Sequence, residues 1–540
     1  MITEAEVLKV LKEGIPKRNN DSLVRGLGLS PSITVKNFDP RPYQLELLTQ
    51  IINEIIHNGK RDILLNLPTG SGKSFIAEAL TMLLDHYGIT SIEPFSKNIV
   101  LTFRNNLIDQ YLKSFKYMYN MKGKSNYKCL LNYRPVGSKT KCVAKGSHTC
   151  DSRFTCEYFL SRTNFYKSQS MVTNYNWYVY NFNVLDLPLL TGTLVMDEVH
   201  TCFDILDEIF NINLDKLADK ARIYHERVNP GVPFEESQLH SNIKNRAFSD
   251  AEGILSSMEE LLYEFDDILS ELDKYLNLRE ELSLLKIIED FNVPPELSKV
   301  DRVKYVFRKI IRRNHSRYDN QVNIFMSATI TKEFFTDHLY EADESKLLYI
   351  NMDPIFPKEN RPLYSMKSLP TFNYDKMNDK EFLDIWSNII MKITDFHKND
   401  KGFIYVNSYA QARELKTRFY KNPRFIINDN ASNATTTLKR FMQDKSNLVL
   451  ISPVIQEGYS FDDDMSRFQI IAKVPFVNSS LIKEYGEKYY YQKTVIALLQ
   501  IIGRSVRNPT DYASTYMIDS AWKLLNKYLP NWFNEAVIEK

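Results

Sequence analysis

Short apolar runs separated by helical patterns recur along the chain. In the first half they lie at Asp62–Asn66, Asn98–Phe103, Ser170–Thr173, Leu194–Met196 and Val322–Met326, and in the second half at Gly402–Val406, Leu448–Ile451, Phe468–Val474 and Thr515–Asp519. Runs of this length are typical of buried strands, and their alternation with helices is typical of a parallel α/β sheet. The pattern predicts two α/β units, joined by a connecting segment in which prolines are crowded at Pro354, Pro357, Pro362 and Pro370.

Two stretches interrupt the first α/β unit. The first holds four of the five cysteines. In the second, apolar residues recur every three or four positions between Ile254 and Leu285, with acidic residues on the other faces, which is the pattern of amphipathic helices. We therefore expect a cysteine-rich insert at 113–167 and a helical insert at 205–320. The other expected segments are an N-terminal extension (1–37), three parts of the first unit (38–112, 168–204 and 321–350), and a linker with the second unit (351–540).

A glycine-rich loop lies between the first predicted strand and the helical pattern that follows it. Its residues are Pro68, Thr69, Gly70, Ser71, Gly72, Lys73 and Ser74. In such a loop backbone N–H groups cradle phosphates, the lysine reaches the β- and γ-phosphates, and the serine hydroxyl ligates magnesium. Leu67 stands where the strict pattern has glycine. The strand before the loop and the helix after it favour a phosphate site over a structural turn with an incidental lysine.

Charged residues at two further places suit the same chemistry. Asp197 and Glu198 follow an apolar strand, where the aspartate can hold the hydration shell of magnesium and the glutamate can orient and deprotonate an attacking water. A bare helix cap is the alternative, but the glycine loop makes the catalytic role the better interpretation. Arg504 and Arg507 are three apart, so on one helical face they would stabilise charge on a transferring γ-phosphate.

The ordered motifs of the chain resemble those of superfamily 2 helicases. They are Arg41–Gln44, the glycine loop, Asp197–His200, Ser327–Thr329, Gln456–Gly458 and Gln500–Arg507, and they extend over residues 38–520. The resemblance implies two RecA-like P-loop motor domains and a helicase driven by ATP and Mg²⁺. It also implies Gln500 near the γ-phosphate, Arg41 and Gln44 by the adenine, and coupling of hydrolysis to domain closure through Ser327, Thr329 and Gly458.

The two inserts are similar in order to those of the XPD/DinG iron–sulfur helicases. Residues 123–129, 156–159 and 356–362 are similar to the edges of that family's cluster domain and to its entry into the second motor domain. The resemblance implies a [4Fe-4S] cluster held by Cys129, Cys142, Cys150 and Cys156, a helical arch, and a monomeric motor that moves 5′ to 3′. It further implies single-stranded DNA and forked or tailed duplex DNA as partners. From the residues alone, four thiols also fit zinc or no metal.

The composition indicates a globular protein and does not identify its nucleic-acid partner. With 43% hydrophobic and 25% charged residues the chain is globular. Its 69 basic and 67 acidic residues give a net charge of +2, so nucleic-acid contacts must come from local basic stretches, such as the one around the cysteines. A zinc-containing superfamily 2 RNA helicase or duplex translocase, and a nucleic-acid-binding protein with a vestigial motor, remain alternatives.

The N-terminus and the hydropathy pattern bear on location. Residues 1–16 alternate charges with single apolar residues and carry no signal peptide. We find no apolar run of the roughly 18 residues that a membrane span requires. We therefore expect a cytoplasmic protein without a membrane partner, in a prokaryote or a virus-infected host cell, and a viral or phage member of the family is one interpretation.

Overall fold

The computed structural model describes most of the chain outside the two inserts. The described residues are 1–14, 38–90, 97–130, 155–182, 191–211, 296–311, 321–366 and 371–539, with gaps at 342, 374, 455–460, 462 and 507–509, and with isolated residues or short pieces at 152, 219, 222, 226, 231–233, 287–288 and 291–294. They divide into two compact units. The first unit is Met1–Leu64, Ser74–Met326 and Phe335–Tyr349, and the second is Leu65–Lys73, Ser327–Phe334 and Ile350–Lys540.

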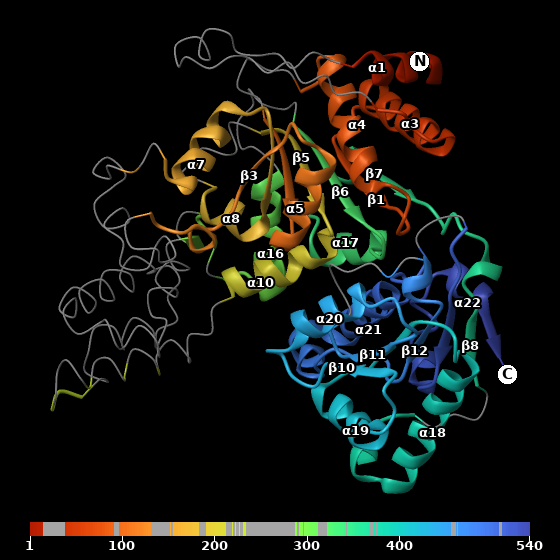
Figure 1. The fold of residues 1–540 in the computed structure, drawn as a ribbon. Coiled ribbons are helices and arrows are strands. Elements are labelled where there is room, and N and C mark those ends of the chain that lie inside the picture. The colour runs from red at the N-terminus through yellow and green to blue at the C-terminus, as the bar shows by residue number, and fades with distance from the viewer. Residues whose placement is uncertain are drawn as a thin grey trace. The chain divides into compact units, whose positions relative to one another are not determined.

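The first sheet is a parallel α/β sheet (Figure 1). Its strand order is β3-β4-β2-β5-β6-β1-β7, and the neighbouring pairs from β3 to β6 run parallel. The strands are β1 (Asp62–Asn66), β2 (Lys97–Thr102), β3 (Tyr119–Met121), β4 (Ser170–Asn174), β5 (Thr191–Asp197), β6 (Val322–Ser327) and β7 (Leu347–Asn351). The helices are α1 (Glu4–Glu13), α3 (Pro42–Asn58), α4 (Lys73–His86), α5 (Asn105–Ser114), α7 (Glu157–Lys167), α8 (Tyr175–Tyr180), α10 (Cys202–Phe210), α16 (Lys299–Ile311) and α17 (Lys332–His338).

The second sheet belongs to the second unit and is also parallel. Its strand order is β10-β11-β9-β12-β13-β8-β14, and every neighbouring pair runs parallel. The strands are β8 (Leu363–Ser365), β9 (Gly402–Tyr405), β10 (Phe425–Ile427), β11 (Val449–Ser452), β12 (Phe468–Ile471), β13 (Ser514–Met517) and β14 (Val537–Glu539). The helices are α18 (Lys380–Phe396), α19 (Tyr409–Phe419), α20 (Ala434–Gln443), α21 (Ser480–Ile502) and α22 (Asn531–Ala536).

Strand β9 explains why the second sheet is covered by helices on both faces (Figure 1). Phe403 and Tyr405 pack in the core cluster that contains residues of α20 and α21, whereas Ile404 and Val406 pack in the cluster that contains residues of α18 and α19. Successive side chains of a strand point to opposite faces of the sheet. A continuous apolar run therefore needs a helical layer on each side, as in parallel α/β folds.

The parallel α/β architecture predicted from the apolar runs is confirmed, and every predicted strand is present with ends shifted by at most three residues. The prediction missed five short strands, β3, β7, β8, β10 and β14. Strand β8 corrects the interpretation of the proline-crowded segment as a connection only. Leu363 follows Pro362 directly and pairs in register with Thr515 of β13, so the segment contributes a strand to the second sheet.

Helix α4 also differs from its expected form. Ile76, Ala79, Leu80, Leu83 and Leu84 were expected on one face and are all buried, but Ala77, Glu78, Thr81 and Met82 are buried too. The helix is therefore enclosed on all sides from 76 to 84. An enclosed helix fixes the loop that precedes it, because neither end can shift without disturbing close-packed neighbours.

Several predictions fall outside the described residues. These are Cys142 and Cys150 and the helical pattern of 254–285. The boundaries of the two inserts remain predictions. At the end of the second insert, α16 packs against the first sheet, with the Phe307 and Phe325 rings 5.6 Å apart. No helix among the described residues is long and apolar enough to cross a membrane.

Candidate nucleotide-binding and hydrolysis site

The glycine loop has the predicted setting between a strand and a helix. Strand β1 is buried over its first four residues, and α4 begins at Lys73. Gly70 and Gly72 have φ angles of 81° and 78°, a region that side chains with a Cβ rarely adopt, so both positions require glycine. The Lys73 ammonium donates a hydrogen bond to the Leu67 carbonyl oxygen at 3.4 Å. The lysine therefore lies back along its own loop in this structure.

The Ser327–Thr329 motif lies against this loop. The Leu67 N–H donates to the Ser327 carbonyl oxygen at 2.9 Å. The Thr329 N–H donates to the Ser327 hydroxyl oxygen at 3.1 Å. The end of β6 is thereby joined to the entry of the glycine loop, which gives the predicted coupling motif a direct backbone connection to that loop.

Asp197 and Glu198 form a sharp turn at the end of β5. Asp197 is the last residue of the strand and is 7% exposed. Glu198 has φ 53° and ψ 46°, a left-handed conformation that costs a non-glycine residue about 1–2 kcal/mol. The Thr201 N–H and hydroxyl both donate to the Glu198 carbonyl oxygen, at 2.9 and 2.8 Å, and so hold the turn. His200 Nδ1 lies 3.5 Å from Glu198 Oε2, while the Glu198 side chain keeps 33% exposure.

Two buried tyrosines hold Asp197, and sequence reasoning missed both. The Tyr111 hydroxyl donates to Asp197 Oδ2 at 3.1 Å, and the Tyr175 hydroxyl donates to the Asp197 carbonyl oxygen at 2.9 Å. Burial, with the Asp197 charge as a second cause, raises the pKa of Tyr111 well above its ordinary value, so the phenol stays protonated. In the sequence, Tyr111 is only an apolar position of an amphipathic helix.

Arg41 and Gln44 lie together at the start of α3. The Gln44 side chain is 4% exposed, and its Oε1 accepts a hydrogen bond from the Arg41 N–H at 2.9 Å. The Arg41 guanidinium donates to the Tyr43 hydroxyl at 3.3 Å. Gln44 thus caps the first turn of α3. Their placement beside an adenine remains a prediction.

The arginine motif near the C-terminus does not have the predicted form. Helix α21 ends at Ile502, and Gly503 caps it. Arg504 lies in the turn that follows, where its N–H donates to the Ile501 carbonyl oxygen at 3.2 Å. The expectation that Arg504 and Arg507 share a helical face is therefore wrong, because glycine is a poor helix former and ends the helix before both arginines. Arg507 and Gly458 lie outside the described residues, and Gln500 lies in the last turn of α21.

Gly503 brings the end of α21 close to the glycine loop. A Cβ at this position would lie 3.2 Å from the Leu499 carbonyl oxygen and 3.4 Å from the Thr69 side chain. Gly503, Leu499 and Thr69 all belong to the second unit. The tightest approach is to the Leu499 carbonyl oxygen of the same helix, whereas Thr69 lies at ordinary van der Waals distance.

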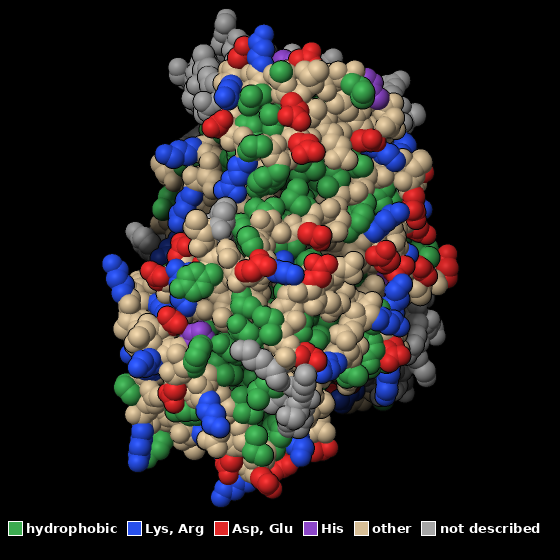
Figure 2. Space-filling model, turned by 90° about the vertical axis from the view of Figure 1, so that its right-hand side faces the viewer, with side chains coloured by type: hydrophobic (Ala, Val, Ile, Leu, Met, Phe, Trp, Pro, Cys, Tyr) green, Lys and Arg blue, Asp and Glu red, His purple; other side chains and the backbone are tan. Residues whose placement is uncertain are grey.

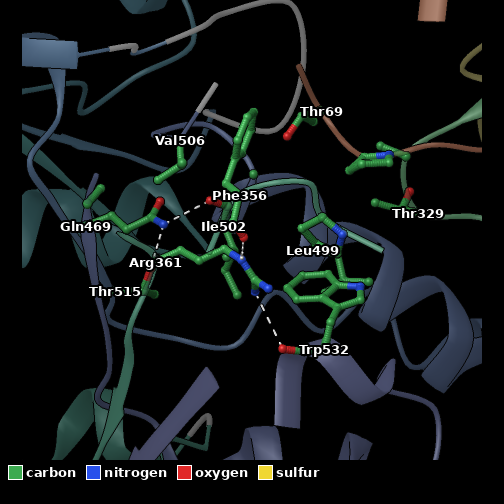
Figure 3. Close-up of a pocket in the computed structure, with 15 residues that line it drawn as sticks. Thr69, Thr329, Phe356, Arg361, Gln469, Leu499, Ile502, Val506, Thr515 and Trp532 are labelled. Carbon is green, nitrogen blue, oxygen red and sulfur yellow. Dashed lines mark hydrogen bonds between the residues drawn. The ribbon is translucent and has the colours of Figure 1, made fainter. Parts of the chain in front are cut away.

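A pocket in the second unit adjoins these motifs (Figure 3). Its lining residues include Thr69, Thr329, Phe356, Leu499, Ile502, Val506 and Trp532. The Arg361 guanidinium lies over the Trp532 ring at 4.9 Å, and its Nε donates to the Phe356 carbonyl oxygen at 3.3 Å. The cavity volume is about 60 Å³, which holds a few water molecules and is small beside ligand pockets of hundreds of Å³. We therefore assign the pocket to packing and not to substrate.

The two described cysteines of the first insert are buried. Cys129 and Cys156 are each 7% exposed, and Cys156 caps the N-terminus of α7. The rings of Tyr127 and Tyr158, each two residues from one of these cysteines, meet edge to face at 5.6 Å. The segment around Cys129 is thus in contact with the segment around Cys156. Among the described residues no group of three or more His, Cys, Asp or Glu side chains could hold a metal ion.

Comparison with known proteins finds similarity in both halves of the chain. A family model described as the helicase C-terminal domain matches residues 390–536, and one described as the type III restriction enzyme, res subunit, matches residues 37–221. The ATP-dependent DNA helicase chl1 of Schizosaccharomyces pombe is 23% identical over 249 residues, 38% of this chain and 29% of that protein. CHL1 of Candida albicans, also an ATP-dependent DNA helicase, is 23% identical over 232 residues, 34% of this chain and 27% of that protein. This chain therefore covers less than a third of the length of these relatives.

Solved structures share the fold. S. tokodaii Xpd4 matches with a TM-score of 0.55 at 15% identity, and a structure titled XPD helicase matches with 0.54 at 14%. Each match covers 93% of this chain and 100% of the other. The two parallel sheets are therefore RecA-like domains arranged along the chain as in XPD. In its domains the chain is similar to helicases, and its fold is similar to that of the XPD structures.

Proposed function

We propose that this chain couples ATP hydrolysis to movement on single-stranded DNA and to strand separation, in the 5′ to 3′ direction. The observation that carries the proposal is the place of two motifs at strand ends of the first sheet. Asp197 ends β5, and the glycine loop follows the end of β1, in a sheet whose strand order includes β5-β6-β1. In open α/β sheets, ligands bind at the carboxyl ends of the strands.

The residues present fit Mg²⁺ and ATP. Mg²⁺ prefers hard oxygen ligands and is usually bound by one or two carboxylates together with substrate phosphates. Ser74 supplies a hydroxyl and Asp197 a carboxylate, so the site needs no larger acidic cluster. When bound, the metal would neutralise charge developing on the transferred phosphoryl group.

Each remaining residue of the site has a proposed role. Lys73 binds the phosphates, and Glu198, held by Thr201 and beside His200, orients and deprotonates the attacking water. Arg504 and Arg507 stabilise the transition state, with Gln500 near the γ-phosphate. Arg41 and Gln44 bind near the adenine. Gly458 acts with the Ser327 motif in domain closure.

The choice of DNA rests on the relatives. The similar chl1 proteins are DNA helicases by name. Basic and acidic side chains are mixed over the face drawn in Figure 2, consistent with binding through local contacts and not through bulk charge. We propose single-stranded and forked or tailed duplex DNA as partners of a monomeric motor. The direction of movement rests on the resemblance to XPD.

We propose further that 113–167 binds a [4Fe-4S] cluster and that 205–320 forms a helical arch. Cys129 and Cys156 are buried, and Tyr127 and Tyr158, each two residues from one of them, are in contact. Four thiolates are the usual ligand set of such a cluster. Cys142 and Cys150 would complete that set.

The motor proposal is tested with Lys73→Ala. We expect ATPase activity to fall at least about a hundredfold, because the phosphates lose their cation, while single-stranded DNA binding persists. The matched control is Lys9→Ala on the exposed face of α1, which should be neutral. Unchanged turnover in Lys73→Ala would refute the assignment. Stimulation of wild-type turnover by RNA or by blunt duplex, and not by single-stranded DNA, would instead indicate an RNA helicase or a duplex translocase.

The cluster proposal has its own test. Protein purified without air is analysed for visible absorbance, iron, sulfide and zinc. A broad band near roughly 400 nm with about four irons per chain is expected. A colourless protein with one zinc, or with no metal, would remove the cluster and with it the support for 5′ to 3′ movement, and would leave the motor in place.

A further inference from the structure

Arg504 lies in a turn that belongs to no helix or strand. Helix α21 ends at Ile502, so helical hydrogen bonds do not hold the residues that follow. The Arg504 N–H donates to the Ile501 carbonyl oxygen at 3.2 Å, and the Arg504 carbonyl oxygen accepts from the Phe461 N–H at 3.1 Å. Phe461 is fully buried, with its ring 5.3 Å from that of Phe403 in β9. The backbone of Arg504 is therefore attached to the core of the second unit.

The side chain of Gln469 holds the same turn from β12 (Figure 3). It is 1% exposed, and its Nε2 donates to the Ile502 carbonyl oxygen at 2.9 Å and to the Thr515 hydroxyl at 2.7 Å. Its Oε1 accepts a hydrogen bond from the Ser505 hydroxyl at 3.4 Å. One amide thus contacts the residue two positions before Arg504 and the residue directly after it.

The partners of Gln469 fix the direction in which its amide points. A carbonyl oxygen only accepts hydrogen bonds, so the Ile502 carbonyl requires the amide nitrogen on its side. Both N–H groups of the amide then have an acceptor, and the amide oxygen faces Ser505. Methionine has a similar length but offers no N–H donor and no carbonyl oxygen. A change to methionine would therefore remove all three hydrogen bonds at nearly constant volume.

Ser505 has a second polar contact, from the segment before β12. The Ser466 and Ser505 hydroxyl oxygens are 2.9 Å apart, and both side chains are fully buried. With Ser466 as the donor in this pair, the Ser505 proton is available for Gln469 Oε1. The residue that follows Arg504 is thus enclosed by two polar side chains, both of which belong to the second unit.

We propose that Gln469 is a positioning residue for Arg504. This inference rests on the proposed function, in which Arg504 stabilises the transition state. Gln469 holds the residues on both sides of Arg504 and so sets the position of the Cα from which the guanidinium side chain extends. It acts through Arg504 and does not itself contact nucleotide. Transition-state stabilisation requires charges that are held in place before the reaction, so loss of Gln469 should lower turnover and spare nucleotide binding.

The test compares Gln469→Met with Ser365→Ala in the full-length chain. Ser365 is a matched control in the same sheet, because it is 2% exposed and its hydroxyl accepts from the buried Trp522 indole N–H at 3.1 Å. ATPase activity is measured against ATP concentration, and binding of the fluorescent nucleotide mant-ADP is titrated. For Gln469→Met we expect kcat to fall about ten- to a hundredfold, as small misplacements of catalytic groups do. The KM for ATP and the mant-ADP affinity should stay within about twofold.

Ser365→Ala should keep the kcat of the wild type. An unchanged kcat in Gln469→Met would overturn the inference. An equal fall in Ser365→Ala would also overturn it, because that result would indicate general loosening of the second unit. Wild-type protein without ATPase activity, or Arg504→Ala with wild-type turnover, would count against the proposed function instead.

A double-mutant cycle with Arg504→Ala separates positioning from packing. If Gln469 acts through Arg504, adding Gln469→Met to Arg504→Ala should lower the single-turnover rate no further. A further fall as large as that in the wild-type background would overturn the proposed link. If Gln469→Met does not fold, Ser505→Ala gives the same comparison, because it removes the bond to Gln469 Oε1 and leaves the bond to Ile502 in place.

Discussion

The Lys97 ammonium donates a hydrogen bond to the Ser168 carbonyl oxygen at 2.6 Å. It donates a second one to the Phe165 carbonyl oxygen at 2.9 Å, and the side chain is 5% exposed. These carbonyls lie at the C-terminal end of α7, where peptide oxygens lack helical partners and a cation is favourable. Lys97 thus ties the helix that begins after Cys156 to β2 of the first sheet.

This buried lysine predicts a specific pH dependence of stability. Burial lowers the pKa of Lys97 from 10.5 to about 8. Between those values the unfolded chain binds more protons than the folded one, so the contribution of Lys97 to the free energy of unfolding rises with pH. It is least favourable below about pH 8 and improves by roughly 3 kcal/mol on going above about pH 10.5.

Urea unfolding of the wild type and of Lys97→Met across this range measures the effect. Subtracting the two curves cancels the other titrating groups. We expect the free energy of unfolding of the wild type, minus that of the variant, to increase as the pH rises. A difference that stays constant with pH would contradict the prediction.

Glu198→Gln should separate hydrolysis from binding. The amide cannot accept the proton of the attacking water, so we expect turnover to fall by about 10² to 10⁴. Affinity for mant-ADP should stay within about twofold of the wild type, since the phosphate loop is untouched. Steady-state ATPase and fluorescence titration give the two values, and Glu208→Gln on the exposed side of α10 is the control. Wild-type turnover in Glu198→Gln would show that another group activates water.

Ser327→Ala tests the coupling role of the motif after β6. The substitution removes the side-chain acceptor of the Thr329 N–H and leaves the backbone bond from Leu67 intact. We expect duplex separated per ATP hydrolysed to fall about tenfold while hydrolysis itself changes little. Parallel unwinding and ATPase assays measure this ratio, and the exposed Ser345→Ala serves as control. An unchanged ratio would assign Ser327 to structure alone.

Gly402→Ala should destabilise the second unit. Gly402 begins the central strand β9, and an added Cβ would lie 2.5 Å from both the backbone oxygen and the ring of Phe468. Overpacking of this kind costs about 1–3 kcal/mol or more. At Gly123 the nearest atom to an added Cβ is at 3.4 Å, so Gly123→Ala should be mild. Thermal melting of both variants tests whether Gly402→Ala lowers the melting temperature more than Gly123→Ala does. Equal melting temperatures would show that β9 can shift to accommodate the added Cβ.

The sequence determined the elements that depend on local pattern. Continuous apolar runs gave the buried central strands, because a strand covered on both faces needs apolar side chains at every position. The glycine loop was predictable because left-handed backbone at Gly70 and Gly72 excludes other residues. Asp197 and Glu198 were predictable because their place after an apolar strand is visible in the sequence alone.

Only the tertiary structure decided which contacts hold these strands, loops and side chains in place. The short strand β8 is stabilised by pairing with β13, where paired residues are 152 positions apart in the sequence, and no local signal encodes that pairing. Arg504 lies outside the predicted helix because α21 ends at Ile502 and Gly503 caps it. In the sequence, Tyr111 is recognisable only as an apolar position of an amphipathic helix. Its role comes from contacts between distant segments, which folding alone brings together.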